Sequence, residues 1–355
     1  MSARQYAALP DPFPMHRGGV LRGARVAFET WGSLAPARDN AILVFTGLSP
    51  SAHAARSAAD TTPGWWDAMI GPSLAIDTDR WFVIVVNSLG SCFGSTGPAS
   101  PDPATGERYR LSFPELAIED IARGGHEVLR TLGIAQAHTI LGPSLGGMVV
   151  LAFAAAHPGA ARRLVSISGS AGATPFAIAL RSLQREAILR DPAWRDGGYA
   201  PDAPPRTGLR LARKLGTITY RSAGEWAQRF GRDRIAGARD PNSFAPEFEI
   251  EGYLEAQAVK FVEVFDANCY LYLSRAMARF ELADLAPGCV ERALVVGVET
   301  DILFPLDDQR RIAARFEQAG VATQFVAMPS IEGHDAFLVD IARFSAAIGS
   351  FLHAS

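Results

Sequence analysis

The sequence predicts an α/β fold with a mainly parallel sheet, helices on both faces and an inserted helical segment. Three observations carry this prediction. Short runs such as 41–45 and 81–86 alternate with helical patterns, and they are continuously apolar, as expected for strands that are covered on both faces. The stretch 173–287 is mostly helical in pattern, with joints that are rich in Pro and Gly. Strand-like runs then return at 293–297 and 323–327.

The early elements follow from periodicity and from the residues at their ends. Residues 24–30 alternate between apolar and polar side chains, which is typical of a half-buried strand near a sheet edge. A helix is expected over 113–132, because Ser112 is a suitable N-cap residue and Gly133 is a suitable end.

The later elements set the predicted domain boundaries. Residues 163–168 form the next predicted strand, and a helix is expected over about 337–353. We therefore expect an α/β core made of residues 1–172 and 288–355. The intervening residues 173–287 are expected to form a helical lid, because they interrupt one sheet with helices.

Composition and charge narrow the function classes. Hydrophobic residues make up 48% of the chain and charged residues 20%, which fits a globular enzyme with a large core. A net charge of −3 without long basic runs does not indicate a surface that binds nucleic acid. No apolar run approaches the roughly 20 residues that span a bilayer, and the N-terminus lacks a signal-peptide pattern. We expect a cytoplasmic protein that binds neither nucleic acid nor membrane.

The three cysteines do not indicate a cross-linked or metal-bound protein. Cys92, Cys269 and Cys289 are too few and too scattered for a disulfide framework or a zinc site. We expect reduced thiols and no metal or redox cofactor.

The most informative motif is the Gly-x-Ser-x-Gly pattern at 142–148. It lies between an apolar run at 138–141 and a helical run of small residues at 149–156. This strand–turn–helix layout is that of the nucleophile elbow in the α/β-hydrolase fold, in which flanking glycines relieve crowding and Ser144 projects above the sheet. The following helix directs its N-terminus at the reacting centre.

A serine hydroxyl needs a base, and the base needs a carboxylate to orient it. In α/β-hydrolases both follow the serine along the chain. Asp301 comes just after the strand at 293–297, and His334 just after the strand at 323–327. Because functional groups gather at the C-terminal ends of parallel strands, we predict a triad of Ser144, His334 and Asp301. The alternatives are a capping aspartate and an ordinary polar histidine.

Two backbone N–H groups are expected to form the oxyanion hole. One belongs to Leu145, directly after the nucleophile. The other belongs to Leu48 in the Thr46-Gly47-Leu48 turn, which follows the strand at 41–45. The alternative for this turn is an ordinary glycine turn.

Longer motifs extend along nearly the whole chain. They are 46–53, 87–98, 142–148, 184–188 with Asp191 and Pro192, 219–222, 268–274 and 333–337. In this order they resemble the homoserine O-acetyltransferase-like acyltransferases of the α/β-hydrolase fold. Residues 46–55, 87–92 and 178–185 look most similar to the serine O-succinyltransferase branch of that family.

The resemblance implies residues that bind an amino-acid acceptor. Arg185 matches the arginine that binds the acceptor's carboxylate, and Asp335 matches the acidic group that receives its ammonium. The alternatives are a solvated helix face for Arg185 and a turn cap for Asp335. The basic residues Arg206, Arg210, Arg213 and Lys214 either meet coenzyme A phosphates or form a solvated helix face.

Two residues depart from the family pattern beside the nucleophile. Pro143 stands where glycine or asparagine is usual, and proline fixes φ and removes a donor, so either the local backbone geometry or the fit of the acceptor is expected to differ. Leu145 replaces a methionine but keeps the backbone N–H, so little effect is expected.

The resemblance implies an acyl-CoA-dependent O-acyltransferase that works through a Ser144 acyl-enzyme. The expected reaction transfers succinyl from succinyl-CoA to L-serine, giving O-succinylserine for cysteine biosynthesis. The alternatives are a homoserine O-succinyltransferase or O-acetyltransferase of methionine biosynthesis and an esterase with the same triad. A further alternative is a binding protein that has the hydrolase fold without catalytic activity. A homodimer with the helical insertion at its interface is expected. The residues that bind the acyl tail are not identified by sequence.

Overall fold

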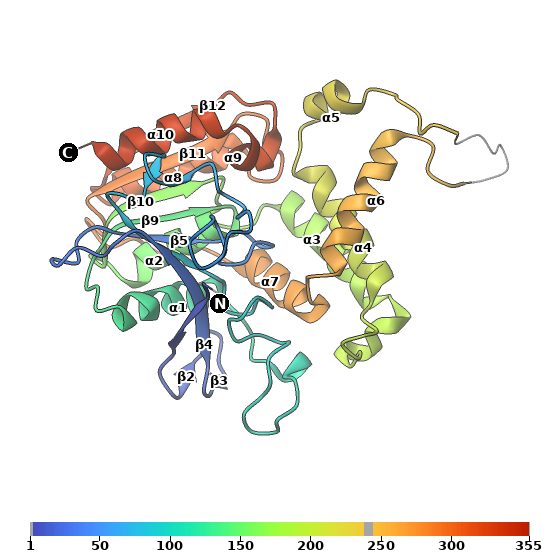
Figure 1. The fold of residues 1–355 in the computed structure, drawn as a ribbon, viewed down its shortest axis with the longest axis horizontal. Helices are drawn as coiled ribbons and strands as arrows, with labels where there is room; N and C mark the ends of the chain where they lie inside the picture. The colour runs from blue at the N-terminus through green and yellow to red at the C-terminus, as the bar shows by residue number, and fades with distance from the viewer. Residues whose placement is uncertain (1–2, 238–243, 355) are drawn as a thin grey trace.

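The computed structural model describes residues 3–237 and 244–354 (Figure 1). Its centre is an eight-stranded sheet with the order β1-β4-β8-β5-β9-β10-β11-β12. The bounds of these strands, in sheet order, are Gln5–Ala8, Arg25–Trp31, Phe82–Val86, Ala41–Phe45, Ala137–Pro143, Ala161–Ile167, Arg292–Val298 and Ala322–Met328.

The predicted α/β class and the parallel sheet are confirmed. All pairs from β8 to β12 are parallel, whereas β4 pairs antiparallel with both β1 and β8. The strand expected near an edge is β4, and it lies second from the edge. It is more buried than its alternating pattern suggested, because Val26 and Phe28 pack in one hydrophobic core cluster and Trp31 in another.

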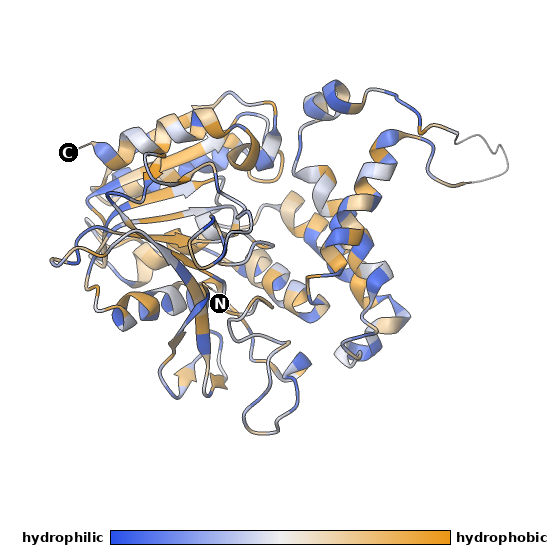
Figure 2. Cartoon of the chain, viewed as in Figure 1, coloured by the Kyte–Doolittle hydropathy of each residue, from blue (hydrophilic) through white to orange (hydrophobic). Residues whose placement is uncertain are grey.

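The two faces of the sheet bury different helices. Leu43 on β5 belongs to a cluster that includes α1 (Ile118–Thr131), α2 (Leu145–Ala156) and α8 (Leu306–Gln318). Its neighbour Val44 belongs to a second cluster, which includes α10 (Ile341–His353). Successive residues of a strand point to opposite faces, so continuously apolar strands are what this double cover requires. Figure 2 shows the apolar residues concentrated in these strands.

Short elements complete the core. They are two small two-stranded sheets, β2 (Phe13–Pro14) with β3 (Val20–Leu21) and β6 (Ile70–Gly71) with β7 (Ile76–Asp77), the 3-10 turns η1 (Arg110–Ser112), η2 (Pro192–Gly197) and η3 (Gly333–Asp335), and the single-turn helix α9 (Ala336–Val339).

The predicted start of the first helix is wrong. Helix α1 begins at Ile118, and Ser112 ends the turn η1 instead of capping the helix. Residue 113 precedes a proline, and a residue before proline is disfavoured in helical conformation. The N-terminal cap is supplied from within the helix, because the Asp120 carboxylate accepts the N–H of Ala117 at 2.9 Å.

The ends of two other predicted elements differ in accuracy. The stop of α1 near Gly133 is confirmed, since this glycine has φ +68°. The single helix expected over 337–353 is instead broken into α9 and α10. The break lies at Asp340, whose ψ of 55° leaves the helical region.

The described part of the chain between β10 and β11 holds five α-helices, within the predicted insertion. They are α3 (Pro175–Leu189), α4 (Arg206–Thr219), α5 (Ala223–Phe230), α6 (Glu249–Val262) and α7 (Ala267–Arg279). Helices α3 to α6 stand beside the sheet, while α7 runs back toward it (Figure 1). Most residues of α7 are buried in the main core cluster, so this helix is part of the core as well as of the insertion.

No single helix of the described ranges is both long and apolar enough to cross a membrane. Residues Gly333–Val339 and Ile341–His353 reach the needed length and hydropathy only when taken together, and they meet at an angle of 75°.

Candidate active site

Ser144 lies at the sharp turn between β9 and α2. Its φ is 58° and its ψ is −119°, a conformation that L-residues rarely adopt. The turn is held by backbone hydrogen bonds on both sides of the serine. The Ser144 N–H donates to the Ile167 carbonyl at 2.9 Å, and its carbonyl accepts the Met148 N–H at 3.1 Å. The strain is therefore supported by the neighbouring strand and by the first turn of α2.

The glycines around Ser144 are required by close backbone contacts. A Cβ atom on Gly142 would lie 2.3 Å from the Gly146 carbonyl, and a Cβ on Gly146 would lie 2.2 Å from the Phe45 carbonyl oxygen. Side chains at these positions would collide with backbone, which cannot move aside cheaply. The Gly-x-Ser-x-Gly spacing therefore reflects the packing of α2 against β9 and β5.

Pro143 is accommodated at the last position of β9. It lies opposite Ile167 on β10, and the Ile167 carbonyl accepts its hydrogen bond from Ser144. The donor that proline lacks is therefore not needed by this carbonyl. The elbow forms with proline in place, and Ser144 has φ 58° and ψ −119°.

The structure brings together the three residues predicted as a triad. His334 Nε2 lies 2.8 Å from Ser144 Oγ, and His334 Nδ1 lies 2.8 Å from Asp301 Oδ2. The other oxygen of Asp301 accepts the N–H groups of Leu303 and Phe304 at 2.8 and 2.9 Å. A carboxylate can only accept, so Nδ1 carries the proton of the neutral ring and Nε2 is free to accept from the serine hydroxyl.

Strand ends position the histidine and the aspartate. Asp301 follows β11, and His334 follows the adjacent parallel strand β12, so both reach the same edge of the sheet. Thr300 joins the two loops, because its hydroxyl donates to the Ser330 carbonyl and accepts the Gly333 N–H. His334 is only 3% exposed and Asp301 only 4%. The pair is therefore held rigidly and away from solvent.

A cavity of about 60 Å³ lies at Ser144. It is lined by Gly47, Leu48, Ser49, Pro50, Trp65, Ser144, Tyr220, His334, Asp335, Phe337 and Leu338. Leu48, one of the two predicted oxyanion residues, is therefore beside the serine. Leu145 is the first residue of α2, and the first N–H groups of a helix have no partner within it.

Asp335 forms one wall of this cavity. Its Oδ2 lies 3.4 Å from Arg221 Nε, and its backbone N–H donates to the Tyr220 carbonyl at 3.0 Å. Burial raises the pKa of Asp335, although the charges of His334, Arg221 and Arg213 oppose the shift. A buried carboxylate with this environment gains from a further cation, such as an ammonium group.

Arg185, which the resemblance assigns to the acceptor's carboxylate, does not line the Ser144 cavity. Its guanidinium donates to Ser274 Oγ at 3.1 Å and lines a separate cavity with Trp194, Tyr272 and Arg275. The physical reason is its depth along α3. Arg185 lies one turn further along this helix than Arg181, and it is Arg181 that reaches the catalytic loops.

Arg181 is a buried cation that sequence reasoning missed. It is 7% exposed, and its guanidinium carbon lies 5.8 Å from the centre of the Phe304 ring, which is 5.0 Å from the His334 ring. Its Nη1 donates only to the Met277 sulfur at 3.4 Å, and its Nε has no partner among the described residues. Burial lowers its pKa, because desolvation disfavours the charged guanidinium. The helical spacing of 181 and 185 was the available signal, because it places both on one face.

Arg213 differs from the other basic residues of the lid. Its Nη1 lies 3.5 Å from Ser49 Oγ and its guanidinium carbon 5.6 Å from the Tyr220 ring centre, so it contacts two residues that line the Ser144 cavity. Its Nε has no partner in the described chain. The remaining basic side chains have carboxylate partners: Arg206 pairs with Glu263, and Arg210 and Lys214 pair with Glu255. The solvated-face interpretation therefore suits those three and not Arg213.

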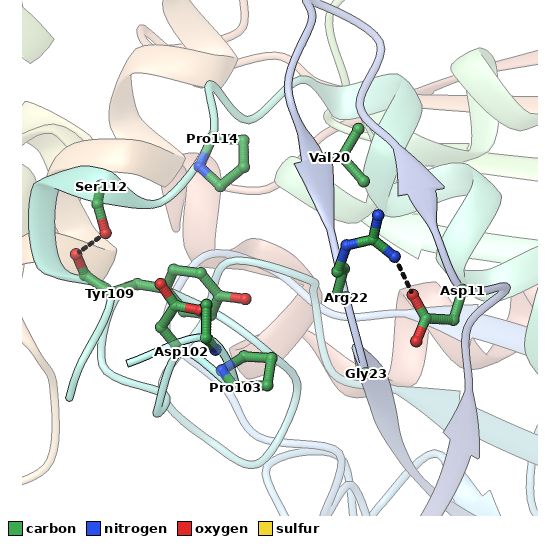
Figure 3. Close-up of a pocket in the computed structure, with 10 residues that line it drawn as sticks. Asp11, Val20, Arg22, Gly23, Asp102, Pro103, Tyr109, Ser112 and Pro114 are labelled. Atoms are coloured by element: carbon green, nitrogen blue, oxygen red, sulfur yellow. Dashed lines mark hydrogen bonds and ion pairs between the residues drawn. The ribbon is translucent and has the colours of Figure 1, made fainter. Parts of the chain in front are cut away.

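Larger cavities lie away from the triad. The one in Figure 3 has a volume of about 530 Å³ and is formed by the hairpin around Val20 and the loop around Asp102. In it, Arg22 points toward Asp11 at 3.6 Å, and no triad residue lines it. Within the described ranges, no group of three or more His, Cys, Asp or Glu residues is arranged to hold a metal ion.

Comparisons of sequence show which known enzymes the whole chain is similar to. Residues 40–340 match the family described as alpha/beta hydrolase fold. A serine O-succinyltransferase of Frateuria aurantia is 57% identical over 361 residues, covering 99% of this chain and 98% of the relative. An L-serine/homoserine O-acetyltransferase of Streptomyces lavendulae is 55% identical, covering 99% of this chain and 97% of the relative.

Solved structures agree on the fold over the full length. A homoserine O-acetyltransferase from Bacillus anthracis has a TM-score of 0.90 at 26% identity, covering 100% of this chain and 99% of that one. Esterase E22 has a TM-score of 0.88 at 27% identity, covering 99% of both chains. Acyltransferases and an esterase thus share this architecture, so the fold alone does not choose between transfer and hydrolysis.

Proposed function

The chain belongs to the alpha/beta hydrolase fold family and, within it, to the O-acyltransferases that include the serine O-succinyltransferases, and from this premise we propose that it transfers succinyl from succinyl-CoA to the hydroxyl of L-serine. The observation that carries the proposal is the identity of 57% over the full length to a serine O-succinyltransferase. The product would be O-succinylserine, a precursor for cysteine biosynthesis. The reaction needs no metal or redox cofactor, because its steps are nucleophilic substitutions at a carbonyl.

The first half-reaction loads the enzyme. His334 Nε2 takes the proton from Ser144 Oγ, and the oxygen attacks the thioester carbonyl. The negative charge that develops on the carbonyl oxygen is stabilised by the N–H groups of Leu48 and Leu145. The carbon–sulfur bond then breaks, His334 returns its proton to the sulfur, and coenzyme A leaves a Ser144 ester behind.

The second half-reaction discharges the ester to the acceptor. His334 takes the proton of the acceptor hydroxyl, the oxygen attacks the ester carbonyl, and Ser144 is released with the proton from His334. Water competes for the same ester. The burial of His334 and the small volume of the cavity support a site from which bulk water is excluded.

Two groups of opposite charge near the cavity, Asp335 and Arg213, suit an α-amino acid. Asp335 offers a carboxylate for the acceptor's ammonium, as the sequence predicted. For the acceptor's carboxylate we propose Arg213 in place of Arg185, because Arg213 contacts Ser49 and Tyr220 of the cavity lining and its Nε has no partner among the described residues. A guanidinium fork pairs with a carboxylate through two hydrogen bonds.

Arg181 supplies a reason for succinyl instead of acetyl. Succinyl carries a second carboxylate beyond the reacting carbonyl, and acetyl has none. Among the described residues no carboxylate pairs with Arg181, although its guanidinium is buried near Phe304. An unpaired buried cation is costly, and a bound succinyl carboxylate would remove that cost. We therefore propose that Arg181 binds the far end of the acyl group.

A second acceptor and a second acyl group stay open, because an L-serine/homoserine O-acetyltransferase is 55% identical. One extra methylene in the acceptor is worth only about 1–3 kcal/mol of discrimination, so some use of homoserine is expected. Hydrolysis is the remaining candidate, since esterase E22 shares the architecture at 27% identity.

The test is a two-by-two assay of succinyl-CoA and acetyl-CoA against L-serine and L-homoserine. Free thiol release is followed with time, and the product is identified by mass. We expect the pair of succinyl-CoA and serine to give the highest kcat/KM. Dominant acetylation of homoserine would overturn the substrate assignment, and thiol release that is independent of any amino acid would favour a hydrolase.

A homodimer formed through the lid is also proposed. Leu211 and Ile218 are 51% and 46% exposed and lie two turns apart on α4, and Phe176 and Leu183 are 52% and 54% exposed with the same spacing on α3. Such apolar stripes suit a second copy of the chain. Sedimentation of the wild type and of L183R with L211R tests this, since a monomeric wild type would contradict it.

A further inference from the structure

His53 lies in the loop that follows β5 and carries Leu48. Its Nδ1 lies 2.8 Å from Oε2 of Glu29, a residue of β4 that is 3% exposed. Its Nε2 lies 2.9 Å from the Thr62 carbonyl oxygen. A carboxylate and a carbonyl can only accept hydrogen bonds, so both ring nitrogens face acceptors. A neutral imidazole has one N–H, whereas the protonated ring has two.

The other groups around the ring agree with this assignment. The Thr62 hydroxyl lies 3.3 Å from Nε2, but it donates its hydrogen to Asp60 Oδ1 at 2.7 Å and so presents a lone pair to the ring. The charged groups that act on His53 are Glu29 and Asp60, and both are anionic. Burial lowers the pKa of His53, but the Thr62 carbonyl and the two carboxylates outweigh it and raise the pKa above 6.5.

We propose that His53 is a positioning residue, which remains protonated and bridges Glu29 and Thr62 so that the loop bearing Leu48 is held against Ser144. The protonation state stands on the hydrogen-bond geometry alone. Its consequence for catalysis rests on the proposed acyl transfer, because Leu48 is there assigned to the oxyanion.

The bridge is coupled to the cavity by the segment on its far side. Trp65 Nε1 donates to the Ser51 carbonyl at 3.1 Å, and Trp65 lines the cavity at Ser144. A Cβ on Gly64 would lie 2.1 Å from the Ala54 carbonyl carbon, so the loop segments around residues 54 and 64 are in direct backbone contact. The contact between His53 and the Thr62 carbonyl therefore also fixes Trp65, which lines the cavity at Ser144.

The same segment reaches the element that carries the catalytic histidine. Trp66 Nε1 donates to the carbonyl of Phe337 at 2.9 Å, in the helix that directly follows His334. Displacement of the loop thus affects both the oxyanion side and the base side of Ser144. A shift of about 1 Å at a reacting centre can reduce the rate about 100-fold.

The pH dependence has a defined sign. With the pKa of His53 raised in the folded protein, the bridge is complete below the ordinary value of 6.5 and is lost as the pH rises through the raised pKa. Loss of the proton leaves the Glu29 carboxylate or the Thr62 carbonyl without its donor. The loop is then less ordered, and activity falls on the alkaline side.

The test compares H53Q and E29Q with H16Q. His16 is a matched control, because its ring also lies near a carboxylate, 3.9 Å from Glu119, but its side chain is 50% exposed. We expect H53Q to reduce kcat about 10- to 100-fold with KM values within about 3-fold, and H16Q to match the wild type. E29Q should move the alkaline limb of kcat to lower pH, which a merely structural role would not do.

Nitrogen-15 NMR of the wild type reports the protonation state without any substrate. Two protonated nitrogens on His53 at pH 7 are expected, with deprotonation above the ordinary pKa of 6.5. A neutral His53 ring at pH 7, or an alkaline limb that does not move in E29Q, would overturn the proposal. If H53Q does not fold, these two measurements still decide. If succinyl transfer fails but the ring is doubly protonated, the proposed function fails and the bridge stands.

Discussion

The catalytic half of the site and the half that we propose binds the substrates are built in opposite ways. Ser144, His334 and Asp301 stand at strand ends, and their hydrogen bonds are taken up by one another and by backbone. Arg181 and Arg213 come from the lid helices α3 and α4, and each has a buried Nε without a partner in the described structure. The hydrogen bonds of the three catalytic residues are complete without a ligand, whereas each of the two arginines keeps a donor without an acceptor among the described residues.

This difference separates positioning from recognition. Groups that must hold a reacting geometry are fixed by the rigid sheet and by saturated hydrogen bonds. Groups that bind a charged ligand keep donors unpaired, which lowers stability until the ligand supplies the acceptor. Substitutions in the first half should therefore abolish turnover, while those in the second half should change substrate preference.

The largest effect is expected for S144A in the catalytic half. Removing the nucleophile of a comparable triad lowers kcat by about 10⁶-fold, so turnover should fall to the limit of detection. Mass spectrometry after mixing with succinyl-CoA should find no acylated protein, and Tm should be retained. Undiminished amino-acid-dependent thiol release would show that another residue carries the acyl group.

R213A should give the next largest effect, and it should fall on the acceptor. Loss of a charge-assisted pair with the amino acid's carboxylate is worth about 2–3 kcal/mol, or about 30- to 150-fold in kcat/KM for serine. Acylation by succinyl-CoA alone should change little. R210A is the matched control on the same helix, because Arg210 is paired with Glu255 and should affect serine use less than about 2-fold.

R181M should change the acyl donor and not the acceptor. Without the buried guanidinium, the preference for succinyl-CoA over acetyl-CoA should fall about 30- to 100-fold in kcat/KM. The same variant should have a Tm equal to or above the wild type in the absence of substrate, because it removes an unpaired buried charge. An unchanged donor preference would remove Arg181 from the acyl site.

R185A sharpens the comparison by having the smallest expected effect. Its side chain bonds to Ser274 and lines a cavity without Ser144, so serine kinetics should stay within about 3-fold of the wild type. A loss of serine use as large as that of R213A would restore the role that the sequence resemblance gave to Arg185.

The accuracy of sequence reasoning follows the same division. Ser144, Asp301 and His334 could be found because each follows a readable strand, and parallel strands end at one edge of the sheet. The start of α1 was misplaced, because a proline and the internal cap by Asp120 outweighed the N-cap signal of Ser112. The break at Asp340 lies within an apolar stretch whose pattern contains no helix breaker.

The chain by itself determined the α/β class, the elbow and the order of the triad, because these depend on local chemistry and on the topology of a parallel sheet. Only the tertiary structure shows which arginine of α3 lies near the catalytic loops. Arg181 and Arg185 lie one turn apart on the same face of α3, so the sequence does not distinguish them. The packing of α3 alone sets how deep each side chain lies relative to the catalytic loops. That depth is why Arg181 reaches the Phe304 ring while Arg185 lies in another cavity.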